Sequence, residues 1–422
     1  MKTLAVTLSV LFCLALTQVA SAAMLLIPMD ETQTDHLKAY GVVYNCLKRD
    51  QQAEWLLNYK YGSFLIKDTP NNRDLCLIRG ILFQPITNSE ASDIYRTIES
   101  ENMERVMLEK PPKIAVYSPA TLQPWDDAVR LALEYAEIDY DMLWDKEVLE
   151  GKLEEYDWLH LHHEDFTGQY GKFLASQRNQ LWYQQDVIAN ENMARALGYN
   201  KVSECKKAVA REIKDYVLRG GFLFAMCSAA ETLDIALAAE NTDIVPAEFD
   251  GDPPDVDCNE RLEYDKCLAF TDFTVSLNSM EYRHSDIDTY PARIERFMTP
   301  DDDLFYLFEF SAKLDPVPTM LVQDHIPVVD GFMGQTTGLR KSLLKKFVIV
   351  LGEPLEYDEV RYVHGNAGKG TFTFYSGHDP EDYQHMLNDP PTDLQVHKNS
   401  AGYRLILNNV LFPAAKKKER KT

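Results

Sequence analysis

The feature that most constrains the fold is an alternation of short apolar runs with amphipathic segments between residues 113 and 240. The apolar runs at 113–117, 140–144, 158–162 and 222–226 have the length of strands, and helical spacing of apolar residues recurs between them. A chain that alternates strand and helix builds a parallel sheet covered on both faces. We therefore expect an α/β fold with a mostly parallel sheet and helices on both faces.

The segments outside this alternation suggest how the chain is organised. Strands at 347–351 and 371–375 and a helix at 401–411 resume the core, while 241–345 breaks the rhythm and is rich in Asp, Pro and Glu at its start. Before the core, an N-terminal α/β segment includes an expected strand at 75–78. The predicted divisions are a signal peptide at 1–22, the N-terminal segment at 23–108, the core at 110–240 and 346–415, an insertion at 241–345, and a basic tail at 416–422.

The N-terminus has the pattern of a secretory signal. Met1-Lys2 gives a positive start, a mostly apolar run follows, and Ala20-Ser21-Ala22 supplies the small residues that a signal peptidase requires. The run is short for a membrane span, and no later apolar stretch is long enough to cross a bilayer. We expect cleavage after Ala22, no membrane span, and a protein that is exported to a periplasm or the extracellular space.

Charge and cysteine content exclude two classes of function. The net charge of −23 argues against nucleic acid as a partner, because a phosphate-binding surface needs an excess of Lys and Arg. Six cysteines follow the signal, and Cys258 and Cys267 are the pair most favoured for a disulfide in an oxidising compartment. No cysteine pair has zinc-finger spacing, so a cysteine-built metal site is not expected.

Cys227 is the best candidate nucleophile. It ends the expected strand 222–226 and precedes a helix, with Ala225 and Ala229 as small residues at two before and two after. A nucleophile on a sharp strand-to-helix turn needs such small neighbours, and the backbone N–H of Ser228 can then serve as an oxyanion donor. The alternative is a buried structural cysteine, which is common in protein cores.

His378 is the natural partner of Cys227. It follows the strand 371–375, so both residues are expected at the carboxyl edge of the sheet, where open α/β folds place their sites. His378 would act as general base, and Asp379 or Glu381 would orient its ring. The alternative is a loop histidine held by the neighbouring carboxylates.

A second group of polar residues surrounds the end of strand 158–162. His160, His162, His163, Glu164 and Asp165 combine ring nitrogens with carboxylates, and with Asp379 or His385 they offer the donors of a divalent metal site. The interpretation we adopt has no metal and no cofactor: the loop instead lines a substrate pocket. Its expected substrate-binding residues are Ser228, His162, His163, Glu164, Gln169 and Tyr170.

The arrangement of Cys227 and His378 resembles the class I glutamine amidotransferase-like superfamily. The resemblance covers about 110–240 and 346–412 and implies a flavodoxin-like core with a nucleophilic cysteine. The chain departs from the family in having Ala225 and Ala229 where the family has glycines at this turn, and an extra residue between His378 and Glu381.

A closer resemblance extends over nearly the whole chain after the signal. The stretches LHLHHEDFTGQYGKF, FMGQTT, FYSGHDPEDYQH and GYRLILNNVLFPAAKKK look like an exported bacterial family whose members are often labelled asparagine synthetase B. A synthetase of that kind needs an N-terminal cysteine after processing and a Ser-Gly-Gly-rich ATP loop, and the sequence has neither.

The function expected from these residues is an exported, glutamine amidotransferase-like hydrolase that acts on an amide or ester of a small molecule or peptide. One alternative is a non-catalytic protein of the same fold that binds a carbohydrate or peptide. The aromatic content of 11% suits such binding. Another is a metal-dependent hydrolase that uses the 160–165 cluster. The oligomeric state is not indicated by the sequence.

Overall fold

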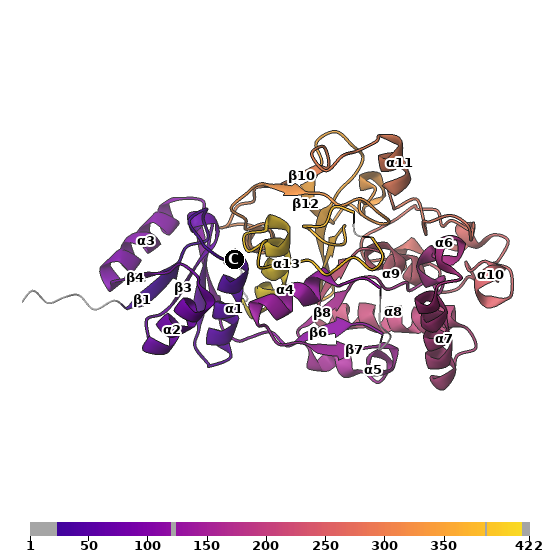
Figure 1. Ribbon diagram of the computed structural model, residues 1–422, viewed down its shortest axis with the longest axis horizontal. Coiled ribbons are helices and arrows are strands. Elements are labelled where there is room, and N and C mark those ends of the chain that lie inside the picture. Colours follow the sequence, from indigo (N-terminus) through magenta and orange to yellow (C-terminus); the bar gives the residue numbers. More distant parts are fainter. Residues whose placement is uncertain (1–22, 120–123, 385, 416–422) are drawn as a thin grey trace, which may run out of the picture.

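The computed structural model describes residues 23–119, 124–384 and 386–415. The expected signal peptide, the basic tail and His385 lie outside these residues. The described chain forms a five-stranded sheet near the N-terminus and a nine-stranded sheet in the larger remainder (Figure 1). No helix in the described ranges has both the length and the apolar character needed to cross a membrane.

The N-terminal sheet is antiparallel, in the order β4-β1-β3-β2-β5. Its strands are β1 Met24–Ile27, β2 Ala53–Leu57, β3 Ser63–Lys67, β4 Gln84–Ile86 and β5 Glu104–Leu108, and its helices are α1 His36–Leu47, α2 Pro70–Arg79 and α3 Asn88–Ser100. The predicted strand at 75–78 is wrong, because these residues lie within α2. The Thr69 side chain accepts a hydrogen bond from the first turn, Pro70 begins the helix, and Gly80 ends it with a left-handed φ of 66°.

The second sheet is mixed, in the order β11-β10-β12-β13-β14-β9-β8-β6-β7. The five strands from β14 to β7 are parallel, and β13, β12, β10 and β11 extend them as antiparallel neighbours. The strands are β6 Ile114–Tyr117, β7 Asp141–Leu143, β8 Trp158–Leu161, β9 Phe222–Met226, β10 Leu304–Leu307, β11 Val328–Asp330, β12 Ile349–Glu353, β13 Tyr362–Ala367 and β14 Gly370–Tyr375. The α/β class is confirmed, but the sheet is parallel only from β14 to β7, because β10, β11, β12 and β13 pair antiparallel.

Helices cover both faces of this sheet. One face packs against α4 Ala128–Ala136 and α13 Ala401–Leu411, and the other against α5 Asp145–Leu149, α8 Val202–Arg219 and α9 Ala229–Ala238. Side chains along each strand alternate between the two cores, as a pleated strand requires.

The N-terminal sheet docks on the α4 side of the core through α1 (Figure 1). Helix α1 contacts both α4 and α13, and its apolar residues belong to the same core cluster. Gly41 allows this close approach, because a Cβ at that position would lie 1.8 Å from the carbonyl oxygen of Ala136.

Two segments add elements that the sequence patterns did not predict. Between β8 and α8 lie α6 Leu174–Gln177 and the long α7 Leu181–Ala196, and the region 241–345 contains α10 Ala247–Asp250, α11 Tyr290–Glu295 and α12 Pro316–Leu321 in addition to β10 and β11. The predicted disulfide between Cys258 and Cys267 is wrong: within the described chain all cysteines are free, and the Cys267 sulfur faces the carbonyl oxygen of Asp234 at 3.3 Å.

Candidate functional site

Cys227 occupies a sharp turn between β9 and α9. Its φ of 47° lies in the left-handed region, which a residue with a Cβ adopts only under constraint from its surroundings. Its N–H donates to the Gly377 carbonyl oxygen at 3.1 Å, and its own carbonyl accepts from the Ala230 N–H at 3.1 Å. Both Ala225 and Ala229 are fully buried, so larger side chains there would have no room. The turn therefore has the geometry predicted for a nucleophile-bearing residue.

Burial keeps the Cys227 thiol protonated. It raises the pKa of Cys227 to about 12, and the negative charge of Asp288 adds to this effect, while hydrogen bonds from Ser228 oppose it. At neutral pH the thiol is therefore a weak nucleophile by itself. An attack by this sulfur needs a base that removes the proton as the bond forms.

His378 lines the same pocket as Cys227. The hydrogen bond between Cys227 and Gly377 brings the residue that precedes His378 against the turn. The pocket has a volume of about 590 Å³ and collects aromatic and polar side chains from segments far apart in the sequence. Its walls include Trp125, His163, Lys172, Phe173, Cys227, Ser228, Tyr282, Phe332, Gln335 and His378.

The two carboxylates expected to orient His378 have other partners. Asp379 is buried, and its carboxylate accepts from the Tyr403 hydroxyl at 2.7 Å and from the Glu381 N–H at 2.9 Å. Glu381 lies 2.8 Å from Nδ1 of His397. The pKa of each carboxyl group is raised, with burial as the first cause. Asp379 thus ties the 377–381 turn to Tyr403 on α13, and Glu381 ties it to His397, which precedes α13.

Five residues that we call the histidine edge meet at the ends of β8 and β14: Asp127, His160, His162, His163 and His378. Asp127 begins α4, and its Oδ1 lies 3.3 Å from His160 Nε2 and 3.1 Å from His162 Nδ1. The same oxygen accepts from the N–H groups at the start of α4, at 2.8 and 3.1 Å. Burial alone would raise the pKa of Asp127, but its histidine neighbours hold it well below the usual range.

The rings of this edge stack on one another. His162 and His163 have ring centroids 3.8 Å apart with a 12° angle between planes, and His378 lies 4.5 Å from His163 and 5.0 Å from His162. His162 is buried, and within the described ranges its Nε2 has no hydrogen-bond partner. Nε2 of His163 lies 3.0 Å from the backbone oxygen of Asp126. Burial lowers the pKa of His163 well below its ordinary value, so this ring is neutral at pH 7.

The remaining predicted residues lie on the loop after β8. Glu164 accepts from the His162 N–H at 2.7 Å, and burial raises its pKa to about 7. Glu164 and Tyr170 line a neighbouring pocket of about 230 Å³ that shares Trp125, His163 and Phe173 with the Cys227 pocket. Gln169 is buried within the loop, where its amide donates to Thr167.

Asp165 organises this loop and does not face the Cys227 pocket. Its carboxylate accepts from the N–H groups of Thr167, Gln169 and Gly171, and its Oδ2 lies 3.2 Å from Nε2 of His284. The other ring nitrogen of His284 lies 3.5 Å from Glu231 on α9. Burial disfavours the charged ring, but the two carboxylates outweigh it and raise the pKa of His284 to about 9.

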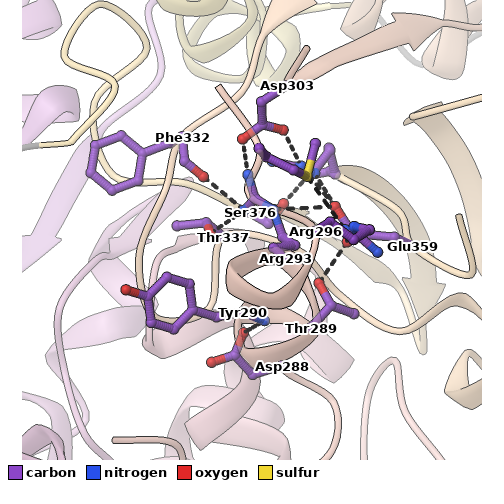
Figure 2. A network of polar contacts seen from close by, with 12 residues as sticks. Asp288, Thr289, Tyr290, Arg293, Arg296, Asp303, Phe332, Thr337, Glu359 and Ser376 are labelled. Carbon is purple, nitrogen blue, oxygen red and sulfur yellow. Dashed lines mark hydrogen bonds and ion pairs between the residues drawn. The ribbon is translucent and has the colours of Figure 1, made fainter. Parts of the chain in front are cut away.

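A second buried group, which we call the arginine network, contacts the backbone of Phe332, a residue that lines the pocket (Figure 2). It consists of Arg293, Arg361, Asp303 and Glu359, all at most 1% exposed. Arg293 pairs with Asp303, and Arg361 pairs with Asp303 and with Glu359. Arg293 also donates to the Phe332 carbonyl oxygen at 2.7 Å. Because the Phe332 ring stacks on His378 at 5.4 Å, the network fixes a neighbour of the candidate base.

Sequence patterns missed several residues of this site. Tyr282, Phe332 and Gln335 line the pocket and come from the region interpreted as an insertion. Asp127 carried a usable signal, since an Asp just before an amphipathic segment is a typical helix cap. Its contact with His160 on β8 and with His162 just after that strand depends on the parallel pairing of β6 with β8.

Comparison with known proteins adds little to this geometry. No family model matches the chain, and no curated protein matches it. Two solved structures from Salmonella typhimurium align with 72% of this chain: cytoplasmic protein STM3548, over 100% of its own length, and cytoplasmic protein STM1381 of strain LT2, over 99%. Each is 12% identical to this chain with a TM-score of 0.35, a level at which neither informs the function.

Proposed function

We propose that this protein is a hydrolase that uses Cys227 to cleave an amide or ester bond. The observation that carries the proposal is the left-handed φ of 47° at Cys227, on a strand-to-helix turn that opens into the same pocket as His378. Maintaining a non-glycine residue there costs about 1–2 kcal/mol, and such strained residues cluster at active sites.

The mechanism follows from the chemistry of these groups. As the Cys227 sulfur attacks the substrate carbonyl carbon, His378 takes the thiol proton, and the Ser228 N–H stabilises the developing oxyanion. The tetrahedral intermediate collapses to a thioester when His378 passes the proton to the leaving amine or alcohol. Water, deprotonated by His378, then releases the acid and restores the thiol.

One further feature is consistent with a glutamine amidotransferase-like core. The parallel strands follow the order β7-β6-β8-β9-β14, which is second, first, third, fourth and fifth along the chain, as in flavodoxin-like sheets. We extend the proposal to membership of the exported family often labelled asparagine synthetase B, and to export through residues 1–22. For the chemistry we propose hydrolysis and not ATP-dependent synthesis.

The test is a screen of chromogenic amides and esters with wild type, Cys227→Ala and Cys227→Ser. We expect both variants to lose at least about 1000-fold in kcat/KM, because a nucleophile cannot be replaced by its neighbours. Iodoacetamide followed by peptide mapping should label Cys227 first, since the other described cysteines are all buried. Activity that survives in Cys227→Ala, with an unchanged melting temperature, would contradict the proposal.

A second candidate is a binding protein without catalysis. Trp125, Phe173 and Trp182 pack together with ring centroids 5.1–5.5 Å apart and line the smaller pocket. Such an aromatic wall suits the apolar face of a sugar ring or a peptide side chain. Ligand binding that depends on Trp182 but not on Cys227, without turnover, would favour this function.

A further inference from the structure

The geometry points to a divalent transition-metal site, of the kind that binds Zn²⁺, formed by His162, His163 and His378. One ring nitrogen from each histidine lies within 4.8 Å of the other two. The stacked rings of His162 and His163, with centroids 3.8 Å apart, would turn apart so that both lone pairs meet one ion. Three protein nitrogens with an open fourth position are the ligand set of a catalytic zinc site. The site shares His378 with the proposed hydrolysis by Cys227, but its existence does not rest on that function.

The first ligand is preoriented by a carboxylate. His162 Nδ1 lies 3.1 Å from Asp127 Oδ1, a close contact that lacks the angle of a hydrogen bond, and the neighbouring carboxylate favours the hydrogen on that nitrogen. Nε2 is then the nitrogen with the lone pair. It is buried without a hydrogen-bond partner in the described ranges, and such an orphaned acceptor in a ring 1% exposed calls for an explanation. A metal ion at Nε2 supplies one, in the carboxylate–histidine–metal arrangement of known sites.

The second ligand is preoriented by the backbone. His163 Nε2 lies 3.0 Å from the carbonyl oxygen of Asp126, and a carbonyl can only accept. Nε2 therefore carries the hydrogen, and Nδ1 offers its lone pair. Asp126 and Asp127 are adjacent at the start of α4, so one short segment sets the tautomers of two neighbouring histidines.

The third ligand and the open position face the pocket. His378 and His163 both line the cavity of about 590 Å³, so an ion between them would be reachable by water or by a substrate. Phe332 stacks on His378 at a 22° angle and limits the orientation of its ring. The site thus has an entry path, which a metal centre requires.

Two other clusters suit a metal less well. Asp127, His160 and His162 also approach one another, but His160 is fully buried and lines neither of the two pockets, so an ion there would have no entry path past it. Asp243, Asp250 and Asp252 surround the ammonium group of Lys201 at 2.7–3.1 Å, so a cation already neutralises them.

The first experiment titrates EDTA-treated, dialysed protein with ZnCl₂ in a calorimeter. We expect one ion per chain in wild type, and Co²⁺ in its place should give the visible spectrum of a four-coordinate nitrogen site. Stoichiometric binding that is lost in His162→Ala and His163→Ala supports the inference. Absence of stoichiometric binding in folded wild type would overturn it.

A variant outside the ligand set sharpens the test without threatening the fold. Asp127→Asn keeps an oxygen that caps α4, since Asn and Asp cap helices equally well, but it removes the charge beside His162. We expect its affinity for Zn²⁺ to fall by about 10–100-fold, the range for outer-shell partners. His397→Ala, a partly exposed histidine paired with Glu381, is the matched control and should bind as wild type does. Equal affinities in these two variants would contradict the assigned geometry.

Failure of this inference can be distinguished from failure of the proposed function. Cys227→Ala should retain the affinity for Zn²⁺ and lose hydrolysis. Because His378 cannot be ligand and base together, Zn²⁺ should suppress hydrolysis by wild type, with recovery in EDTA. Hydrolysis that instead requires Zn²⁺ and survives in Cys227→Ala would support the metal site and overturn the cysteine mechanism. If the protein binds no Zn²⁺ and its hydrolysis depends on Cys227, the cysteine mechanism is supported and the metal site is overturned.

Discussion

The histidine edge and the arginine network are both buried, and both touch the pocket through Phe332 and His378, yet they are built differently. In the arginine network two guanidinium groups face two carboxylates, so positive and negative charge balance within the core. In the histidine edge, Nε2 of His162 has no hydrogen-bond partner among the described residues, and the rings of His163 and His378 line a cavity. The difference indicates that the network holds structure, while the edge is arranged to meet a ligand or a proton.

The two groups also lie on different halves of the sheet. The histidine edge follows the carboxyl ends of the parallel strands β8 and β14, where loops converge. The arginine network joins β13 to the region that supplies β10, β11 and α11 (Figure 2). The pocket is therefore lined from both halves of the sheet, with His378 following β14 and Phe332 following β11.

The largest effect should come from breaking the arginine network. Arg293→Ala leaves Asp303 buried with one partner fewer and releases the Phe332 carbonyl, so we expect a loss of about 3–5 kcal/mol in the free energy of unfolding. Urea denaturation measures it. Arg296→Ala is the matched control, because Arg296 binds Glu359 from a side chain that is 26% exposed and should cost about 1 kcal/mol or less. Similar losses of unfolding free energy in both variants would contradict the prediction that the buried pair of Arg293 and Asp303 stabilises the fold more than the partly exposed Arg296 does.

The next prediction tests whether the positive charge on His284 stabilises the folded state, as the arginine network does. Its folded-state pKa of about 9 lies above the ordinary value of 6.5, so protonation favours the folded state. This contribution is fully present below about pH 6.5 and is lost as the pH rises through about 9, with a magnitude of at most about 3 kcal/mol. His284→Gln should flatten the dependence of unfolding free energy on pH in that interval, measured by urea denaturation at each pH. A slope in the variant equal to that of wild type would rule out His284 as its source.

The smallest effect isolates the strain at the candidate nucleophile. Cys227→Gly and Cys227→Ala both delete the thiol, but only glycine adopts a φ of 47° without penalty. We expect the glycine variant to be about 1 kcal/mol more stable than the alanine variant, although glycine elsewhere in an element usually destabilises. Thermal unfolding compares them. If the alanine variant were as stable as the glycine variant or more stable, the left-handed φ at Cys227 would not be strained.

Much of the parallel half was predictable, because its signals are local. The strands at 113–117, 140–144, 158–162, 222–226 and 371–375 correspond to β6, β7, β8, β9 and β14 within one or two residues at each end. Helix α13 spans 401–411 as expected. Apolar runs and helical periodicity show which residues of a single segment are buried. In this half of the sheet the residues that are buried follow those local patterns.

The errors occur where a local pattern is ambiguous. Leu75 to Ile78 is a short apolar run that suits a strand, but Leu77 and Ile78 are exposed on α2, and the cap at Thr69 decides the outcome. Helix α7 was missed because its buried face is narrow, with only Tyr183, Asn190 and Ala194 buried. Cys258 and Cys267 are close in sequence, but each is buried as a free thiol.

The sequence by itself determined the α/β class, the position of Cys227 between a strand and a helix, and the presence of His378 after a later strand. Each of these depends on neighbours within a few residues. Only the tertiary structure decided that Asp127 meets His162, that Phe332 stacks on His378, and that Asp379 turns toward Tyr403. These contacts join residues 24 to 46 positions apart across different elements, and strand order, together with the packing of α4 and α13, sets them.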